Sequence, residues 1–180
     1  MMAAGLQIAV AQDNGMWLGG TLSIVGTSNA QTQSVTTIMP EFGYNLTGPW
    51  AIGGRVGYTV DRRVQNDNVR RETLFSIVPF VRYSAGNTLQ LFGQGELPLG
   101  FTGGRHFDGT TMDGSTMVGL RFRPGLVYHL TERWGATMLM PPAIELINHN
   151  GTTTYRIGIN DSYTLQRYLL DTHIGLIYFF

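Results

Sequence analysis

Apolar and polar side chains alternate with a period of two along most of this 180-residue chain. From Val118 to Leu130 the alternate positions carry Val, Leu, Phe, Pro, Leu, Tyr and Leu, with Gly, Arg, Arg, Gly, Val and His between them. This period is typical of strands with one apolar and one polar face, and no run of about 20 apolar residues predicts a membrane-spanning helix. Turn residues delimit eight predicted strands, over residues 15–27, 34–46, 50–61, 73–84, 88–103, 115–130, 134–147 and 164–180.

The connections between these predicted strands alternate in length. The tight turns are 46–49, 85–87 and 131–133, and the longer polar connections are 28–33, 62–72, 104–114 and 148–163. Three short and four long connections are what eight up-and-down strands require when both termini lie on the side of the tight turns. No repeat, linker or low-complexity segment indicates a second domain, so we predict one β-barrel domain over residues 13–180.

Composition indicates which face of these strands is buried. Charged residues make up 13% of the chain and hydrophobic residues 43%, whereas soluble domains carry about 25% charged residues. The interior of an eight-stranded barrel is only wide enough to be filled by side chains, so the large apolar residues would overfill it. We therefore predict that the apolar faces point outward into lipid, and that small residues and paired charges fill the lumen. A soluble ligand-binding barrel is the alternative fold.

The last strand ends in the segment HIGLIYFF, with Gly175, Tyr178 and a terminal aromatic residue, Phe180. This pattern resembles the β-signal that the assembly machinery of bacterial outer-membrane barrels reads. With the eight-strand plan, it makes the chain similar to the small outer-membrane protein A/X-like barrel superfamily. The resemblance implies an eight-stranded antiparallel up-and-down transmembrane β-barrel in the outer membrane of a Gram-negative bacterium, with periplasmic termini.

The first twelve residues differ from the rest of the chain. A short apolar stretch ends in Ala9-Val10-Ala11, the small-x-small pattern of a signal-peptidase site, but the stretch lacks a positively charged start. We expect residues 1–12 to be the remnant of a signal peptide or an N-terminal extension.

Charged residues on the polar faces would lie inside the barrel. Buried ions must be paired, and the Arg guanidinium suits carboxylates well; all 12 basic residues are Arg. Glu145 also lies on a polar face if the alternation continues past Pro141 and Pro142. In the predicted strand 73–84 the lumen face is ambiguous, because apolar residues share a face with Arg82. We predict a lumen network that plugs the barrel, with a narrow ion path as the alternative, formed by Arg55, Arg82, Arg121 and Arg123 against Glu41, Glu96 and Asp171.

Two further groups of residues would face the membrane or its surface. Arg62, Arg63, Arg70 and Arg71 lie in the second long connection, where they could contact lipopolysaccharide phosphates or simply be solvated. Aromatic residues near the tight turns predict a periplasmic girdle, formed by Tyr44, Trp50, Tyr83, Tyr128, Trp134, Tyr178 and Phe180.

Candidate catalytic and metal-binding residues are sparse. The chain has no Cys, and its four His residues have no zinc-ligand spacing. The Asp-Gly pairs at 108–109 and 113–114 lack the ligand pattern of a calcium loop, so we expect no metal and no cofactor. Ser, His and Asp residues that an enzyme acting on lipid A would need occur in the long connections, without a trusted triad spacing: His106, Asp108, Ser115, His149, Asp161 and Ser162.

Together these features predict a monomeric, non-enzymatic outer-membrane barrel with a structural or surface-interaction role through four extracellular loops. The alternatives are a small porin-like channel and, less favoured, a lipid A-modifying enzyme. Expected partners are outer-membrane lipids, lipopolysaccharide, the barrel assembly machinery and other outer-membrane proteins. The formal net charge of zero gives no electrostatic case for nucleic acid.

Overall fold

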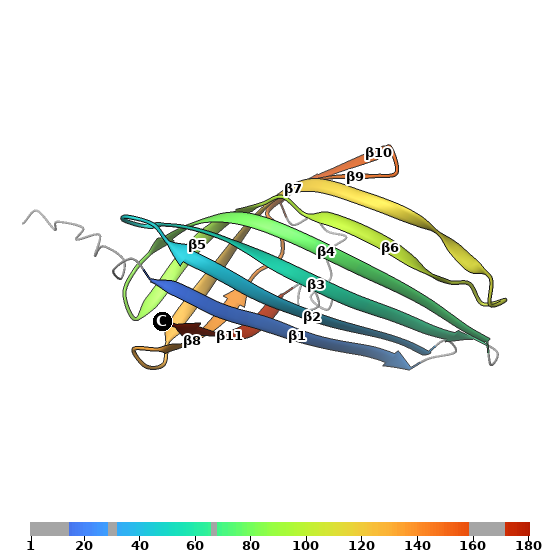
Figure 1. Cartoon of the computed structure of the whole chain (residues 1–180), viewed down its shortest axis with the longest axis horizontal. Helices are drawn as coiled ribbons and strands as arrows, with labels where there is room; N and C mark the ends of the chain where they lie inside the picture. Colours follow the sequence, from blue (N-terminus) through green and yellow to red (C-terminus); the bar gives the residue numbers. More distant parts are fainter. Residues whose placement is uncertain (1–14, 29–31, 66–67, 159–171) are drawn as a thin grey trace, which may run out of the picture.

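The computed structural model describes residues 15–28, 32–65, 68–158 and 172–180, and all regular structure in these ranges is β-strand (Figure 1). These residues include no helix that is long and apolar enough to cross a membrane. The strands are β1 (Met16–Ser28), β2 (Thr32–Asn45), β3 (Trp50–Gln65), β4 (Asn68–Ala85), β5 (Leu89–Glu96), β6 (Leu99–Arg105), β7 (Thr111–His129), β8 (Trp134–Leu139), β9 (Ile144–His149), β10 (Thr152–Ile157) and β11 (His173–Phe179).

Eight strands form a closed antiparallel ring at the end of the molecule where the tight turns lie. The ring runs β1-β2-β3-β4-β5-β7-β8-β11, and β11 pairs back to β1 with Trp17 opposite Phe179 and Thr21 opposite Gly175. We call this part of the barrel the short-turn half and the opposite part the hairpin half. Within the ring every strand is paired on both sides, as a wall in lipid requires, whereas beyond Thr21 strand β1 pairs only with β2 among the described residues. The predicted eight-stranded antiparallel barrel is confirmed.

Prolines interrupt two of the predicted strands. Segment 88–103 is divided at Pro98 into β5 and β6, and segment 134–147 is divided at Pro141 and Pro142 into β8 and β9, because Pro has no N–H to donate to the ladder. Strand β7 spans both breaks: it pairs with β5 and β8 in the short-turn half, and with β6 and β9 in the hairpin half.

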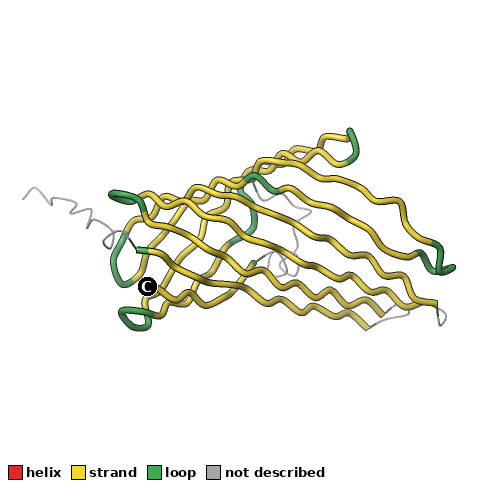
Figure 2. Tube along the Cα trace, viewed as in Figure 1, coloured by secondary structure: helices red, strands yellow, loops and turns green. Residues whose placement is uncertain are grey.

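The second predicted long connection, residues 62–72, is not a loop. Strand β3 continues to Gln65 and β4 begins at Asn68, with unbroken pairing between them, so only residues 66 and 67 lie outside the two strands. The long strands β1, β2, β3, β4, β6 and β7 therefore continue past the closed ring as one curved sheet that ends in the β3–β4 and β6–β7 hairpins (Figure 2). These strand ends are polar on both faces, and for that reason the period of two disappears from the sequence there.

The fourth predicted long connection also contains strands. Strands β9 and β10 form a hairpin whose turn, Asn150-Gly151, has positive φ angles of 49° and 85°, as expected for the turn type that Asn-Gly favours. The third connection is shorter than predicted, since β6 ends at Arg105 and β7 begins at Thr111. Residues 159–171 and the predicted N-terminal segment 1–12 lie outside the described residues.

The outer wall is apolar over the short-turn half, as predicted. On β3, Ile52, Val56 and Tyr58 are each about 45% exposed, while Arg55 between them is 3% exposed and points into the lumen. A barrel that buries arginines and exposes aliphatic side chains reverses the arrangement of a soluble protein, as expected for a protein surrounded by lipid. The alternative of an apolar-lined ligand cavity with a polar exterior is therefore not what the chain forms.

The prediction that large apolar residues all face outward is wrong inside the short-turn half. There an apolar cluster fills the barrel interior, and glycines on neighbouring strands make room for its rings. A Cβ on Gly43 would overlap the Trp17 indole, and a Cβ on Gly125 would overlap the Phe92 ring. We call this group of buried side chains the apolar layer; it consists of Trp17, Phe80, Phe92, Val127, Leu139 and Ile177.

Candidate functional site

Four charged side chains from four neighbouring strands meet inside the short-turn half. Arg82 on β4 donates from Nη2 to Oε1 of Glu41 on β2 at 2.8 Å, and Arg55 on β3 places Nε 3.4 Å from Oε2 of the same Glu41. Arg55 also donates from Nη2 to Oε1 of Glu96 on β5. The register of the ladder brings them together, since Glu41 lies directly opposite Arg55. All four side chains are at most 10% exposed.

Gln94 joins these charges into one network. Its Oε1 accepts from Arg82 Nε at 2.8 Å, its Nε2 donates to Glu96 Oε1 at 2.9 Å, and the residue has no exposed surface. The sequence places Gln94 on the same polar face as Glu96, and that shared face was the available signal for including it. We call Glu41, Arg55, Arg82, Gln94 and Glu96 the lumen network; its two Arg and two Glu side chains balance in formal charge, as burial requires.

Arg82 connects the lumen network to the apolar layer. Its guanidinium carbon lies 4.1 Å from the ring centroid of Phe92, 4.6 Å from that of Trp17 and 5.2 Å from that of Phe80. A guanidinium among ring faces gains cation–π attraction while it remains paired with a carboxylate. The depression next to Arg82 at the short-turn mouth has a volume of about 30 Å³, which is room for about two water molecules.

Two other predicted members, Arg121 and Arg123 on β7, lie directly opposite Glu96 and Gln94 in the ladder but have hydrogen-bond partners outside the lumen network. Arg121 on β7 donates from Nε to Glu145 Oε1 at 3.1 Å, and Arg156 on β10 donates from Nη2 to Glu145 Oε2 at 2.5 Å. Arg123 donates from Nε to the carbonyl oxygen of Met140 at 2.8 Å. Asp171 lies outside the described residues. The structure thus separates a second ionic group, on β7, β9 and β10, from the lumen network, and the alternation does continue to Glu145 beyond the two prolines.

The paired arginines of the β3–β4 hairpin divide between the two faces of the wall. Because consecutive strand residues point to opposite sides, Arg63 and Arg70 face the lumen, whereas Arg62 and Arg71 face outward. Arg63 lies 2.9 Å from Asp61, and Arg70 lies 3.2 Å from Glu72. The four arginines therefore do not share one face, and their contact with lipopolysaccharide stays a prediction.

Aromatic side chains surround the short-turn end on the outside of the barrel. Trp50 and Tyr83 are a directly paired couple on β3 and β4 with ring centroids 5.0 Å apart, and Trp134 and Tyr178 repeat this contact at 5.0 Å on β8 and β11. The remaining predicted girdle residues lie at the same end (Tyr44, Tyr128 and Phe180).

The predicted β-signal forms the strand that closes the ring. Tyr178 contacts Phe180 with ring centroids 5.1 Å apart, and the Phe180 backbone N–H donates to the Met16 carbonyl oxygen at 2.9 Å. Gly175 permits the close approach of the first strand, because a Cβ there would overlap the Gly20 carbonyl oxygen. The three signal residues thus lie on the seam between the last and first strands.

Two of the candidate catalytic residues come together in the hairpin half. Ser115 on β7 and His149 on β9 are hydrogen-bonded, with 2.9 Å between Oγ and Nε2, and the Thr102 hydroxyl contacts the Ser115 hydroxyl. His106 and Asp108 are instead in the β6–β7 turn, and residues 161 and 162 are not described. Within the described ranges no group of three or more His, Asp or Glu residues is arranged to hold a metal ion.

No protein-family model and no curated protein sequence matches the chain. Among solved structures, the crystal structure of Neisserial surface protein A (NspA) aligns over 92% of this chain and 93% of its own, with a TM-score of 0.50 and 13% identity. The chain has the fold of a bacterial outer-membrane β-barrel. The β domain of the Bordetella autotransporter BrkA is also similar, over 81% of this chain and 65% of its own, with a TM-score of 0.45 and 16% identity.

Three features of the chain agree with the fold of an outer-membrane barrel. Its outer wall is apolar over the short-turn half, several of its aromatic residues form a ring at one end, and the charged side chains that are buried in the described ranges lie on the lumen side. The finer assignment to the A/X-like superfamily stays a prediction.

Proposed function

We propose that this outer-membrane barrel is a monomeric, non-enzymatic surface protein of a Gram-negative outer membrane, with a plugged lumen and with its hairpins as the contact surface. The observation that carries the proposal is the filling of the short-turn half by the apolar layer and, next to it, the lumen network. Side chains from all eight strands contribute to this filling, and the interior of a ring of this size is only wide enough to be filled by side chains. The proposal therefore assigns no solute passage to the barrel and places its function on the exposed hairpins.

The outer apolar wall supports the membrane location. The outward positions from Trp50 to Val60 on β3 carry no charge, and Arg62 is the first charged outward residue. Ten residue steps of about 3.3 Å, tilted by about 40°, give an apolar band about 25 Å tall, which is the height that outer-membrane barrels present to lipid. In the orientation we propose, the aromatic ring at the short-turn end and both termini face the periplasm, and the hairpins face outward.

The lumen can be tested with the purified full chain. The barrel should be found in the outer-membrane fraction, should shift in gel mobility on heating, and should give no steady conductance in a planar bilayer. The matched control is Trp17→Ala/Phe80→Ala/Phe92→Ala, which removes the rings of the apolar layer and should conduct if it is inserted. A large steady conductance from the wild-type chain would refute the plugged lumen, and release of the protein without detergent would refute the membrane location.

A second candidate function is hydrolysis of an acyl ester at Ser115. The observation in its favour is the 2.9 Å contact with His149, because an imidazole can accept the proton of a serine nucleophile. The test compares the lipid A acylation pattern of cells that produce the wild-type chain with that of cells that produce Ser115→Ala. A pattern that is identical in both and in cells without the protein rejects this candidate.

A further inference from the structure

Three arginines form a row on the outer wall where the apolar band ends. In the ladder, Arg62 on β3 lies directly opposite Arg71 on β4, and Arg71 lies directly opposite Arg105 on β6. All three occupy outward positions and are exposed. Neighbouring strands are about 4.8 Å apart, so three guanidinium groups share a small area of the surface. We call these residues the outer arginine row.

Within the described ranges, the outer arginine row has no carboxylate partner. Among the described residues, no carboxylate lies within 4.0 Å of these three guanidinium groups, although the lumen-facing Arg63 and Arg70 of the same hairpin are both paired. Like charges placed directly opposite each other destabilise a strand pair. Three adjacent cations that no described carboxylate pairs with thus leave a local repulsion that an external anion would reduce.

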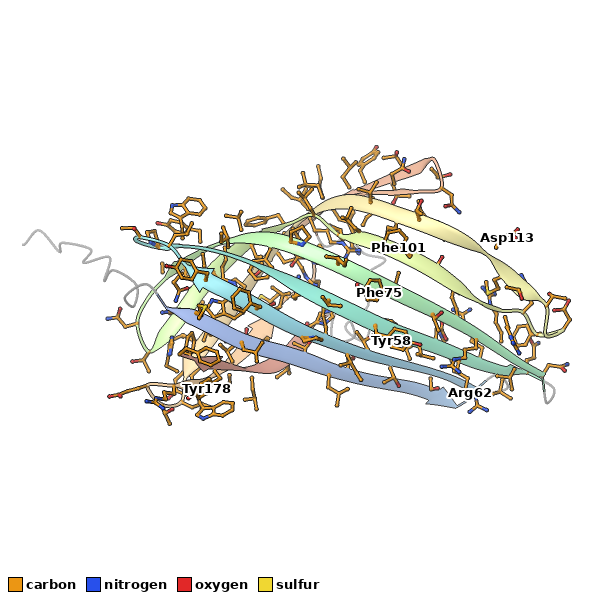
Figure 3. The ribbon with its side chains drawn as sticks, viewed as in Figure 1. Tyr58, Arg62, Phe75, Phe101, Asp113 and Tyr178 are labelled. Atoms are coloured by element: carbon orange, nitrogen blue, oxygen red, sulfur yellow. The ribbon has the colours of Figure 1, made fainter. Side chains whose placement is uncertain are left out.

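An aromatic row lies below the outer arginine row on the same three strands. Tyr58, Phe75 and Phe101 are directly opposite one another, 41–53% exposed, and four residues nearer the short-turn end than the arginines (Figure 3). The spacing along each strand is about 13 Å. The outward positions between the two rows carry Val60, Thr73 and Gly103, whose side chains are small, so little projects from the wall between the rows.

We propose that the outer arginine row binds the phosphate groups of lipid A in the outer leaflet, with the acyl chains packed against the aromatic row. This inference rests on the proposed outer-membrane location. Guanidinium groups bind phosphate in a bidentate manner, and their position at the edge of the apolar band is the depth at which the phosphates of a lipid headgroup lie. Arg105 belongs to this site although the sequence pattern gave no sign of it, whereas Arg63 and Arg70 do not.

The hairpin supplies a matched pair of variants for the test. Arg62→Gln/Arg71→Gln removes two outward charges, and Arg63→Gln/Arg70→Gln removes two lumen-facing charges at the same height and with the same change in net charge. Binding of purified bisphosphorylated lipid A to the full chain in detergent micelles is measured by fluorescence anisotropy. At about fivefold per arginine, we expect the outward pair to weaken binding about 25-fold, and the addition of Arg105→Gln to bring the loss to the order of 100-fold.

The lumen-facing pair should change the affinity less than about threefold. Equal losses in the two double variants would overturn the inference, because they would reduce it to general attraction of charge. Each variant is first checked for heat-shifted gel mobility. The wild-type chain gives a test that needs no variant: it should bind lipid A at least tenfold more tightly than the same glycolipid without phosphates, and equal binding would overturn the inference. Because the assay uses micelles, its outcome is independent of cell fractionation, which tests the proposed location alone.

Discussion

Replacement of Glu96 by Gln tests whether the lumen network holds the barrel together. The Glu96 side chain is 1% exposed and accepts hydrogen bonds from Arg55 and Gln94. The substitution keeps the shape of the side chain but leaves two arginines against the single carboxylate of Glu41. Removal of one partner from a buried ionic group costs about 3–5 kcal/mol, because the remaining charge stays buried without compensation. We expect the free energy of unfolding to fall by that amount.

The control is the same substitution at Glu72. Its ion pair with Arg70 is 3.2 Å long, but the Glu72 side chain is 36% exposed, so solvent screens the pair and the expected cost is below about 1 kcal/mol. A second control, Glu96→Gln/Arg55→Gln, restores neutrality, because the 2.8 Å pair of Arg82 with Glu41 remains. The double variant should therefore lose much less stability than the sum of the two single variants.

Urea unfolding of the full chain in detergent micelles, followed by tryptophan fluorescence, measures the free energies of unfolding of the wild type, Glu96→Gln, Arg55→Gln, the double variant and Glu72→Gln. If Glu96→Gln costs no more stability than Glu72→Gln, the lumen network does not behave as a buried ionic group. Additive losses in the double variant would equally refute the reasoning, since they would mean that Arg55 and Glu96 do not compensate each other.

Three further predictions concern other parts of the barrel. Gly43→Val should cost about 1–3 kcal/mol in the same urea assay because its side chain meets the Trp17 ring, and Trp17→Leu should recover part of the loss; a Gly43→Val chain as stable as the wild type contradicts the packing. Deletion of Phe180 should lower the amount of folded, heat-shifted barrel in the membrane, and an undiminished amount argues against the β-signal. The Thr110 hydroxyl and backbone N–H hold the pKa of the Asp108 carboxyl below its ordinary value of 3.8, so this turn should keep its hydrogen bonds above that pH and lose them as the pH falls through the lower, folded-state pKa. An NMR titration of the Thr110 amide would detect this, and a midpoint above 3.8 would contradict it.

The alternation of side chains was sufficient to predict the barrel wall and its inverted burial. It could not show which apolar residues face inward, because Phe80 and Ile77 have the same hydrophobic character and lie on opposite faces of β4. The deciding fact is a glycine on the neighbouring strand, Gly53, whose Cβ would overlap the Phe80 ring. That pairing depends on the register between strands, which a single sequence does not contain.

The candidate sites depended on register in the same way. Glu41, Arg55, Arg82 and Glu96 were predictable as lumen residues, but Arg121 and Arg123 on the same polar face meet different partners because β7 crosses both halves of the barrel. The division of the arginine pairs between two faces had a usable signal, since residues 62 and 63 cannot share a face if the strand continues. Because residues 62–72 were predicted to be a loop, the alternation of faces along a strand was not applied to them.

The length of the β3–β4 ladder therefore determines how the arginines of the hairpin half are arranged. In a flexible loop, Arg62 and Arg71 would sample many positions, and any anion bound there would have to offset the entropy of ordering the loop. Paired strands remove that cost, because the ladder continues past these residues as far as Gln65 and Asn68 and fixes their direction. The same pairing makes Arg105 their neighbour through β6. A strand end placed four residues further along the chain thus converts a set of solvated charges into an ordered row, and the chemistry of that row matches a phosphorylated lipid surface.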